Sequence, residues 1–414
     1  MPVTDQIISA IPARPGGGTR KKRQLPLLAS LLFGAIAASL LILKFAPAPF
    51  FWVWLAWAAV LFAATFRVHG DWLRPILFNL GIVACFMAGA EAYFFTADKY
   101  IPPTRSNGFF VDNDILGWAP TKGMQAHAVE TGPAGLFHHP AGVVFDATYT
   151  IDANGLRVAP PYREEDLAGT ALFFGCSYTF GSGLNDDETL PYQVGVQSGG
   201  RYRAYNFAFE AYSPAQMLAA LEHGMVRRVV DTAPGYAYYV AIPHHVWRVA
   251  GRVPWLRHEP RYVLDADGTL HRAGYFEDHQ PLALRLGLGR RVAAQLDKSA
   301  MWQRFTAADS HVTHEDIRLY LAMVRRSQEL LTAQYPGIQF RVILWPGHSV
   351  EQRSIYEKMR AGFLGMGIPV DLVEDILPGY RTNEARFTLS PGDTHPNALA
   401  DRLLAQHILH QIEP

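Results

Sequence analysis

This chain has few cysteines and no net charge. Its 414 residues include two cysteines, Cys85 and Cys176, and their separation and different surroundings exclude a disulfide framework. The 37 basic and 37 acidic residues cancel, and charged residues make up only 18% of the chain. This balance argues against a nucleic-acid-binding protein and against a disordered one. Internal repeats and low-complexity tracts are not evident either, so nothing indicates a repeat array.

Long apolar stretches, by contrast, follow one another near the N-terminus. They cover about residues 25–43, 48–66 and 76–95, and each approaches the roughly 20 residues that a helix needs to span a bilayer. A buried core helix or a cleaved signal peptide is the alternative, but three stretches with polar breaks favour an anchor of three transmembrane helices over residues 25–98. Residues 1–24, with the basic cluster Arg20–Arg23, are expected to be disordered.

The basic residues predict how the anchor is oriented. The cluster at 20–23 and the pair Arg67 and Arg74 fall on the same side if all three stretches span, and that side should be cytoplasmic. An odd number of spans then places the rest of the chain outside the cytoplasm. The sequence therefore predicts a multi-pass protein of the inner (cytoplasmic) membrane with an extracytoplasmic domain.

A serine follows an apolar run in the middle of the chain. Residues 170–174 are typical of a buried strand in a parallel sheet, Gly175 ends the run, and Ser177 comes next. Ligands bind at the carboxyl edge of strands in open α/β sheets, so Ser177 is a candidate nucleophile. The neighbouring thiol of Cys176 is an alternative nucleophile, and a purely structural serine in a glycine-rich loop is a third interpretation.

A candidate partner for Ser177 lies near the other end of the chain. Asp393, Thr394, His395 and Pro396 precede a helix-like run, and the proline favours an extended His395 at a turn. A serine needs an adjacent base to become nucleophilic, and the base needs an acceptor that orients it. His395 is the candidate base and Asp393 the candidate acceptor.

Together these two stretches resemble the first and last sequence blocks of the SGNH/GDSL hydrolase family. The first block, usually Gly-Asp-Ser, is Gly175-Cys176-Ser177 here, and the last block keeps His395 and Pro396 with Asp393 two residues before the histidine rather than three. The resemblance covers roughly the last 245 residues. It implies a flavodoxin-like α/β/α sandwich over residues 169–414, with the activity of a serine esterase or acyltransferase.

The resemblance also implies an oxyanion hole. Its donors would be the backbone N–H groups of Ser177 and of Ala211, which stands at about the position of a family glycine. The family supplies an asparagine from its third block, where this chain has His244 and His245. Either imidazole N–H could replace it, and the alternative is that both histidines are structural and hydrogen-bonded to backbone groups. No Asp, Glu or Cys accompanies this histidine pair at ligand spacing, so neither a metal nor another cofactor is expected.

The remaining sequence predicts additions to this sandwich. Residues 99–168 are expected to form a β-rich collar, in which residues 154–157 resemble an Asn-x-x-Gly-x-Arg-like stretch of membrane-anchored relatives. About residues 250–309 interrupt the α/β pattern as an insertion beside the catalytic edge. Basic residues within it, such as Arg290 and Arg291, would suit an anionic substrate or a solvated surface.

The predicted function is that of a membrane-anchored serine esterase or O-acyltransferase acting on ester-linked acyl groups of envelope or secreted polysaccharide. Its substrate would be an acylated glycan or a lipid, and transfer would require an acyl-donor membrane protein as partner. Two alternatives remain, a lipid-directed esterase or lysophospholipase and a non-catalytic glycan-binding or assembly subunit. The sequence does not choose between hydrolysis and transfer.

Overall fold

The computed structural model describes residues 50–68, 72–97, 108–131, 142–253, 258–279, 299–302, 311–390 and 393–413, with residues 33, 36, 39 and 296. The chain divides into two compact units. The first comprises residues 1–98 and 298–301, and the second comprises residues 99–297 and 302–414.

The first unit contains two packed apolar helices, α2 (Phe51–Arg67) and α3 (Leu73–Ala97). Among the described helices, one stretch is long and apolar enough to cross a membrane, Leu73–Phe94 of α3, with a mean hydropathy of 1.6. Helix α2 begins only after Pro49 and has 17 residues, which leaves it shorter than the predicted span. The first predicted span and the basic N-terminus lie outside the described residues, except for residues 33, 36 and 39. The structure thus supports one candidate span, not the three predicted.

Glu91 of α3 is buried within this first unit. Its side chain is 1% exposed, and its carboxylate accepts hydrogen bonds from Ser299 Oγ at 2.8 Å and from the backbone N–H groups of Ala300 at 2.5 Å and Met301 at 3.2 Å. A buried carboxylate is tolerated when its oxygens are hydrogen-bonded. These bonds explain how an acidic residue fits an apolar helix, and they place a segment of the predicted insertion with the helices of the first unit.

The second unit is built on a sheet of five parallel strands. Their order across the sheet is β11 (Val370–Leu372), β10 (Gln339–Leu344), β7 (Tyr236–Ala241), β5 (Gly169–Phe174) and β6 (Tyr202–Asn206). Numbered along the chain and read from β6, this is the order 2-1-3-4-5 of flavodoxin-like sheets. The predicted α/β fold with a parallel sheet is confirmed.

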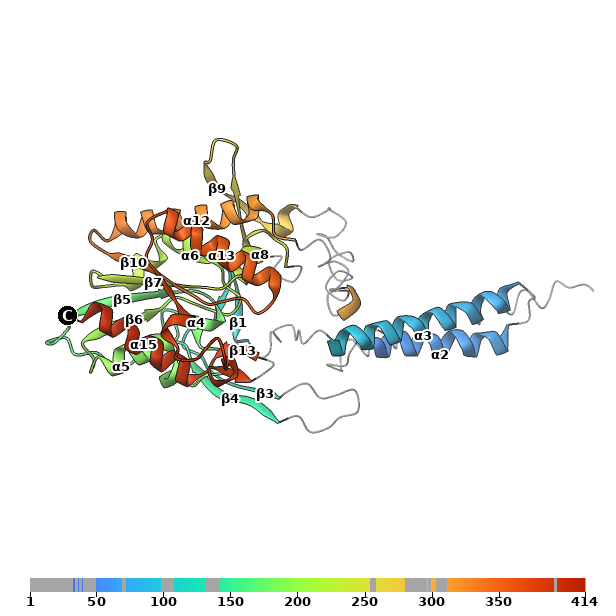
Figure 1. The fold of residues 1–414 in the computed structure, drawn as a ribbon. Helices are drawn as coiled ribbons and strands as arrows, with labels where there is room; N and C mark the ends of the chain where they lie inside the picture. The colour runs from blue at the N-terminus through green and yellow to red at the C-terminus, as the bar shows by residue number, and fades with distance from the viewer. Residues whose placement is uncertain are drawn as a thin grey trace, which may run out of the picture. The chain divides into compact units, whose positions relative to one another are not determined.

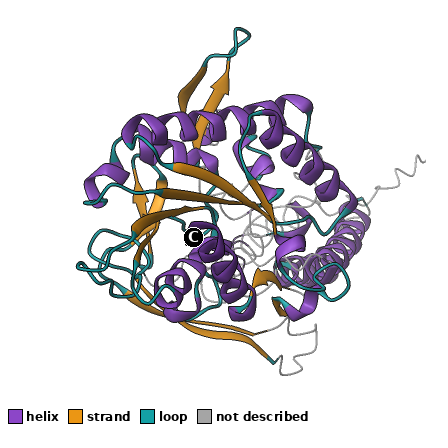
Figure 2. Cartoon of the chain, turned by 60° about the vertical axis from the view of Figure 1, so that its left-hand side comes forward, coloured by secondary structure: helices purple, strands orange, loops and turns teal. Residues whose placement is uncertain are grey.

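Helices cover both faces of this sheet, as Figures 1 and 2 show. Alternate residues of β5 separate the two cores: Leu172 and Phe174 pack on one face, and Ala171 and Phe173 on the other. All four side chains are at most 2% exposed, which is why this segment reads as an unbroken apolar run. The covering helices are α6 (Pro214–Glu222), α12 (His314–Gln334) and α13 (Val350–Gly365) on the first face, and α5 (Leu190–Gln197) and α15 (Ala398–Ile412) on the second.

Shorter elements surround the sandwich. Four antiparallel pairings join β1 (Phe110–Asn113) to β2 (Gly117–Pro120), β3 (Gln125–Thr131) to β4 (Val143–Thr150), β8 (Pro260–Leu264) to β9 (Leu270–Tyr275), and β12 (Thr388–Ser390) to β13 (Asp393–Pro396). The short helices are α4 (Ser177–Phe180), α7 (Met225–Val229), α8 (His244–Val249) and α14 (Val373–Ile376), with 3-10 turns at Asp186–Glu188, Phe276–His279 and Glu384–Arg386. The basic residues Arg285, Arg290, Arg291 and Arg304 of the predicted insertion lie outside the described residues.

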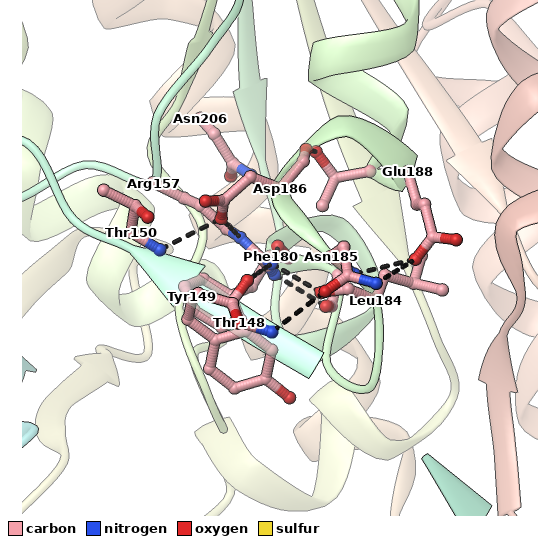
Figure 3. Close-up of polar contacts among 12 residues, drawn as sticks. Thr148, Tyr149, Thr150, Arg157, Phe180, Leu184, Asn185, Asp186, Glu188 and Asn206 are labelled. Atoms are coloured by element: carbon pink, nitrogen blue, oxygen red, sulfur yellow. Dashed lines mark hydrogen bonds and ion pairs between the residues drawn. The ribbon is translucent and has the colours of Figure 1, made fainter. Parts of the chain in front are cut away.

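Arg157 is a buried cation that joins β4 to the loop following Ser177 (Figure 3). The residue is 2% exposed, and its guanidinium carbon lies 4.5 Å from the ring centroid of Tyr149. Every guanidinium nitrogen donates: Nε to Asp186 Oδ1 at 3.1 Å, Nη1 to the carbonyls of Phe180 at 2.8 Å and Gly181 at 2.6 Å, and Nη2 to those of Thr148 at 3.2 Å and Leu184 at 2.5 Å. One side chain therefore holds the whole loop between α4 and α5.

Replacing Arg157 by alanine should destabilise the protein strongly, because Asp186 and four carbonyls would each lose a hydrogen-bond donor. We expect a loss of about 3 to 5 kcal/mol in the free energy of unfolding, measured by denaturant titration of the detergent-solubilised chain. Arg318→Ala is the matched control, since Arg318 pairs with Glu315 on the surface and should cost below about 1 kcal/mol. Equal losses for the two variants would contradict this role of Arg157.

Candidate active site

Ser177 lies in a tight turn directly after β5. Gly175 has φ +154°, and a Cβ at this position would lie 2.2 Å from Thr179 Oγ1 and 3.1 Å from the carbonyl oxygen of Val240. Only glycine therefore fits between the strand and the first turn of α4. Ser177 begins α4 and is 6% exposed, at the carboxyl edge of the sheet.

The structure brings Ser177, His395 and Asp393 together. Nε2 of His395 lies 2.8 Å from Ser177 Oγ, and Nδ1 lies 2.6 Å from Asp393 Oδ1. The same carboxylate oxygen accepts the backbone N–H of His395 at 2.9 Å. Both residues belong to β13, where positions i and i+2 point to the same side, so the two-residue spacing serves this geometry. The arrangement is that of a nucleophile, a base and an orienting carboxylate.

Charges around the base favour its protonated form. Burial lowers the pKa of His395, but the hydrogen bond and charge of Asp393, with the charge of Glu210, outweigh it and raise the pKa above its ordinary 6.5. Burial raises the pKa of Asp393, but hydrogen bonds from His395 outweigh it and hold this pKa below 3.8. An imidazolium that forms when His395 takes a proton is therefore stabilised where it forms.

Tyr178 supports the base from the side. Its ring lies 5.0 Å from that of His395 and 5.4 Å from that of Trp345, measured between centroids. Its hydroxyl lies 2.9 Å from Oγ1 of Thr394, the residue between the two members of the predicted pair. Because Tyr178 directly follows Ser177, this contact connects β13, which carries His395, to the turn that carries Ser177.

The backbone N–H groups of Ser177 and Ala211, at this edge of the sheet, have no hydrogen-bond partner among the described residues. Strands β5 and β6 are parallel neighbours, so the turns that follow them meet at the same edge. Ala211 has φ +60°. In the described part of the chain it is the one non-glycine residue with a positive φ. A left-handed non-glycine residue costs about 1 kcal/mol or more, and such strain concentrates at functional sites.

The two histidines after β7 have different environments. His245 is 0% exposed, and its Nδ1 lies 2.6 Å from the hydroxyl of Tyr239, so it belongs to the core and the prediction that it could donate to an oxyanion is wrong. The His244 side chain reaches the surface, but the protein packed around its ring disfavours the charged imidazolium. Together with the charges of Arg248 and His348, this lowers the pKa of His244 to about 4. A neutral imidazole keeps one N–H donor, so the predicted donor role rests on His244 alone.

Cys176 does not share the setting of Ser177. Its side chain is 0% exposed and packs in the core on the face covered by α5 and α15. An ester cannot reach this thiol, which excludes Cys176 as the alternative nucleophile.

The sequence did not single out three charged residues that act on this site. Glu210 raises and Arg248 lowers the pKa of His395, and the pKa of Glu130 is itself raised by burial and by the charge of Asp393. Nη1 of Arg248 donates to the carbonyl of Tyr212 at 2.7 Å. Glu130 lies on β3, Glu210 in the turn after β6, and Arg248 on α8, and no local sequence motif marks any of the three. Among the described residues no group of three or more metal-binding side chains occurs.

The chain matches no family model and no curated protein sequence. Distant likenesses to solved structures include a lipolytic protein and an acetylxylan esterase. A lipolytic protein of the G-D-S-L family from Desulfitobacterium hafniense is 11% identical, with a TM-score of 0.29, over 58% of this chain and 98% of that one. The acetylxylan esterase Axe2 from Geobacillus stearothermophilus, as a catalytic mutant, is 15% identical, with a TM-score of 0.32, over 60% of this chain and 95% of that one. Such distant likenesses add nothing to the geometry described above.

The pH dependence of the reaction should report the His395–Asp393 pair. His395 must be neutral to accept a proton, so the rate of inactivation by a fluorophosphonate should fall as pH drops through a pKa above 6.5. Asp393→Asn removes the group that raises this pKa, so the fall should move to lower pH and the optimal rate should drop by about 10³- to 10⁴-fold. Asp375→Asn, at an exposed surface pair with Arg381, is the control. An unchanged profile in Asp393→Asn would refute the orienting role.

Proposed function

We propose that this chain is a serine hydrolase or acyltransferase that acts on ester bonds. The observation that supports this proposal most is a hydrogen-bonded chain of three side chains. Ser177 Oγ lies 2.8 Å from Nε2 of His395, and Nδ1 of His395 lies 2.6 Å from Asp393 Oδ1. The pair lies at the carboxyl edge of a parallel sheet, beside two backbone N–H groups without partners in the described chain.

The proposed reaction has two halves. Ser177 Oγ attacks the ester carbonyl while His395 Nε2 takes its proton, and the carbonyl oxygen becomes an oxyanion held by the N–H groups of Ser177 and Ala211, with His244 as third donor. When the tetrahedral intermediate collapses, the bond to the leaving oxygen breaks and His395 returns the proton to the alcohol. Water, or a sugar hydroxyl in a transferase, then attacks the acyl-serine while His395 takes its proton. The bond from the acyl carbon to Ser177 Oγ breaks, His395 returns the proton to Ser177, and the free acid or the acylated sugar is released.

The proposed substrate is an acylated glycan of the cell envelope or of a secreted polysaccharide. The half-buried Glu130 lies close enough to the base for its pKa to respond to the charges of Asp393 and His395, and hydroxyl-rich sugars suit such a polar rim better than a long acyl chain does. The candidate membrane span found among the described helices favours a second possibility, an esterase that takes lipid substrates from the bilayer. Transfer instead of hydrolysis would require a membrane protein that delivers the acyl group.

Ser177→Ala should abolish labelling by a fluorophosphonate and lower ester hydrolysis at least about 10⁴-fold, because the attacking oxygen is lost. Cys176→Ala, which changes a buried neighbour, should still be labelled. Acetate release from acetylated oligosaccharide is then compared with fatty-acid release from phosphatidylcholine vesicles to separate glycan from lipid esters. If wild-type protein is not labelled, and Ser177→Ala supports its pathway as well as wild type, the chain is a non-catalytic binding subunit instead.

We propose further that α3 anchors the protein in the inner membrane with the second unit outside the cytoplasm. A reporter that is active only outside the cytoplasm, fused after residue 413, should be active, and one fused at residue 70 should be inactive. A third fusion at residue 46 distinguishes three spans, which predict activity there, from one, which predicts none. Inactivity of the fusion at residue 413 would overturn the proposed location.

A further inference from the structure

The turn that carries Ala211 is tied to the turn that carries Ser177 through two side chains. The N–H of Ser182 donates to the carbonyl of Ser177 at 3.0 Å. The hydroxyl of the same Ser182 donates to the carboxylate of Glu210. Glu210 immediately precedes Ala211, so three consecutive links join the residue of the nucleophile to the residue of the second oxyanion donor.

The hydrogen bond between Ser182 and Glu210 is partly buried. Ser182 is 7% exposed, and Arg157 and Tyr149 hold the loop around it, since Tyr149 Oη accepts the N–H of Gly183 at 2.7 Å. On the other side, the carbonyl of Glu210 accepts Trp118 Nε1 at 2.9 Å. A partly buried hydroxyl-to-carboxylate bond between two anchored segments restrains their separation more than a fully solvated one does.

Ala211 needs such a restraint because of its backbone conformation. At φ +60° an alanine pays about 1 kcal/mol or more relative to its preferred conformations, and it remains there only if neighbouring contacts impose it. Relaxation of the turn would rotate the N–H of Ala211 away from the edge of the sheet. A glycine would hold the same conformation without this cost.

We propose that Glu210 is a positioning residue of the active site, which uses its hydrogen bond from Ser182 to hold Ala211 in the left-handed conformation that presents the second oxyanion donor. This inference rests on the proposed esterase function. Neither Ser182 nor Glu210 touches the reacting atoms in this scheme; both act through Ala211.

The charge of Glu210 gives this role a second readout. The titratable and charged groups around His395 are Asp393 on β13, Glu130 on β3, Arg248 on α8, Tyr178 on α4 and Glu210 after β6. Of these, Glu210 raises the pKa of His395 together with Asp393. Glu210→Gln keeps an acceptor for Ser182 but removes the charge, so it separates the hydrogen bond from the electrostatic effect.

The test compares ester hydrolysis by full-length wild type, Ser182→Ala, Glu210→Ala and Glu210→Gln, with 4-nitrophenyl acetate as the probe. Ser182→Ala and Glu210→Ala should lower kcat/KM about 10- to 100-fold, mainly through kcat, which is less than the 10²- to 10³-fold cost of losing a whole oxyanion donor. Glu210→Gln should retain more activity than Glu210→Ala, and its acid limb should move to lower pH. Glu222→Gln is the control, because its carboxylate accepts Tyr262 Oη at 2.7 Å at the opposite end of α6.

The same substitutions in an Ala211→Gly background show whether backbone conformation is the link. Glycine adopts the left-handed conformation without help, so Ser182→Ala should cost less there than in the wild-type background. Equal costs in both backgrounds, or wild-type kcat/KM in Ser182→Ala, would overturn the inference. Thermal unfolding of each variant shows whether a loss of kcat/KM comes only from a loss of folded protein. If it does, the positioning role of Glu210 is overturned. Wild type that neither hydrolyses the probe nor reacts with a fluorophosphonate overturns the proposed function as well.

Discussion

The hydrogen bond between Ser177 Oγ and His395 Nε2 joins side chains 218 positions apart, and much of the second unit is arranged so that they meet. The C-terminal helix α15 follows the histidine strand and packs against α5, which follows the serine loop. A buried carboxylate fixes this pairing, because Asp401 of α15 accepts the N–H of Leu190 at the start of α5 at 2.9 Å. At its other end, the carbonyl of Ile412 accepts Tyr202 Oη at 3.0 Å, so α15 is held at both ends.

Local chemistry explains why the fold and the central pair could be predicted. An apolar run with no alternation requires a strand covered on both faces, and β5 is such a strand. Gly175 marks the turn because any side chain would collide with Thr179. Pro396 keeps His395 extended, and the strand then aligns Asp393 with it. Each of these signals lies within a few residues of the feature that it predicts, so the sequence carries them directly.

The residues that the sequence did not reveal act through contacts between distant segments. Arg157 holds a loop that begins more than twenty positions later. It donates to the carbonyls of Phe180 and Gly181, which are 23 and 24 positions away in the sequence. Glu91 bonds to Ser299 across 208 positions. A pattern such as Asn154 to Arg157 marks an arginine but not its partners, and a lone glutamate in an apolar helix carries no sign of what it binds. The predicted donor role of His245 failed for the same reason, because only the packing places its ring beside Tyr239.

Charge placement around Ala211 bears on how this site can work without the asparagine of the family's third block. A carboxylate next to an oxyanion donor would by itself oppose the negative charge that forms there. Here the Glu210 carboxylate is engaged by Ser182, while the carbonyl of Tyr212, on the other side of Ala211, is bound by the cationic Arg248. The same Glu210 charge stabilises protonated His395, which in the proposed mechanism forms together with the oxyanion. The turn thus lies between the Glu210 carboxylate, which favours the imidazolium, and the Arg248 cation, which offsets the effect of that carboxylate on an oxyanion.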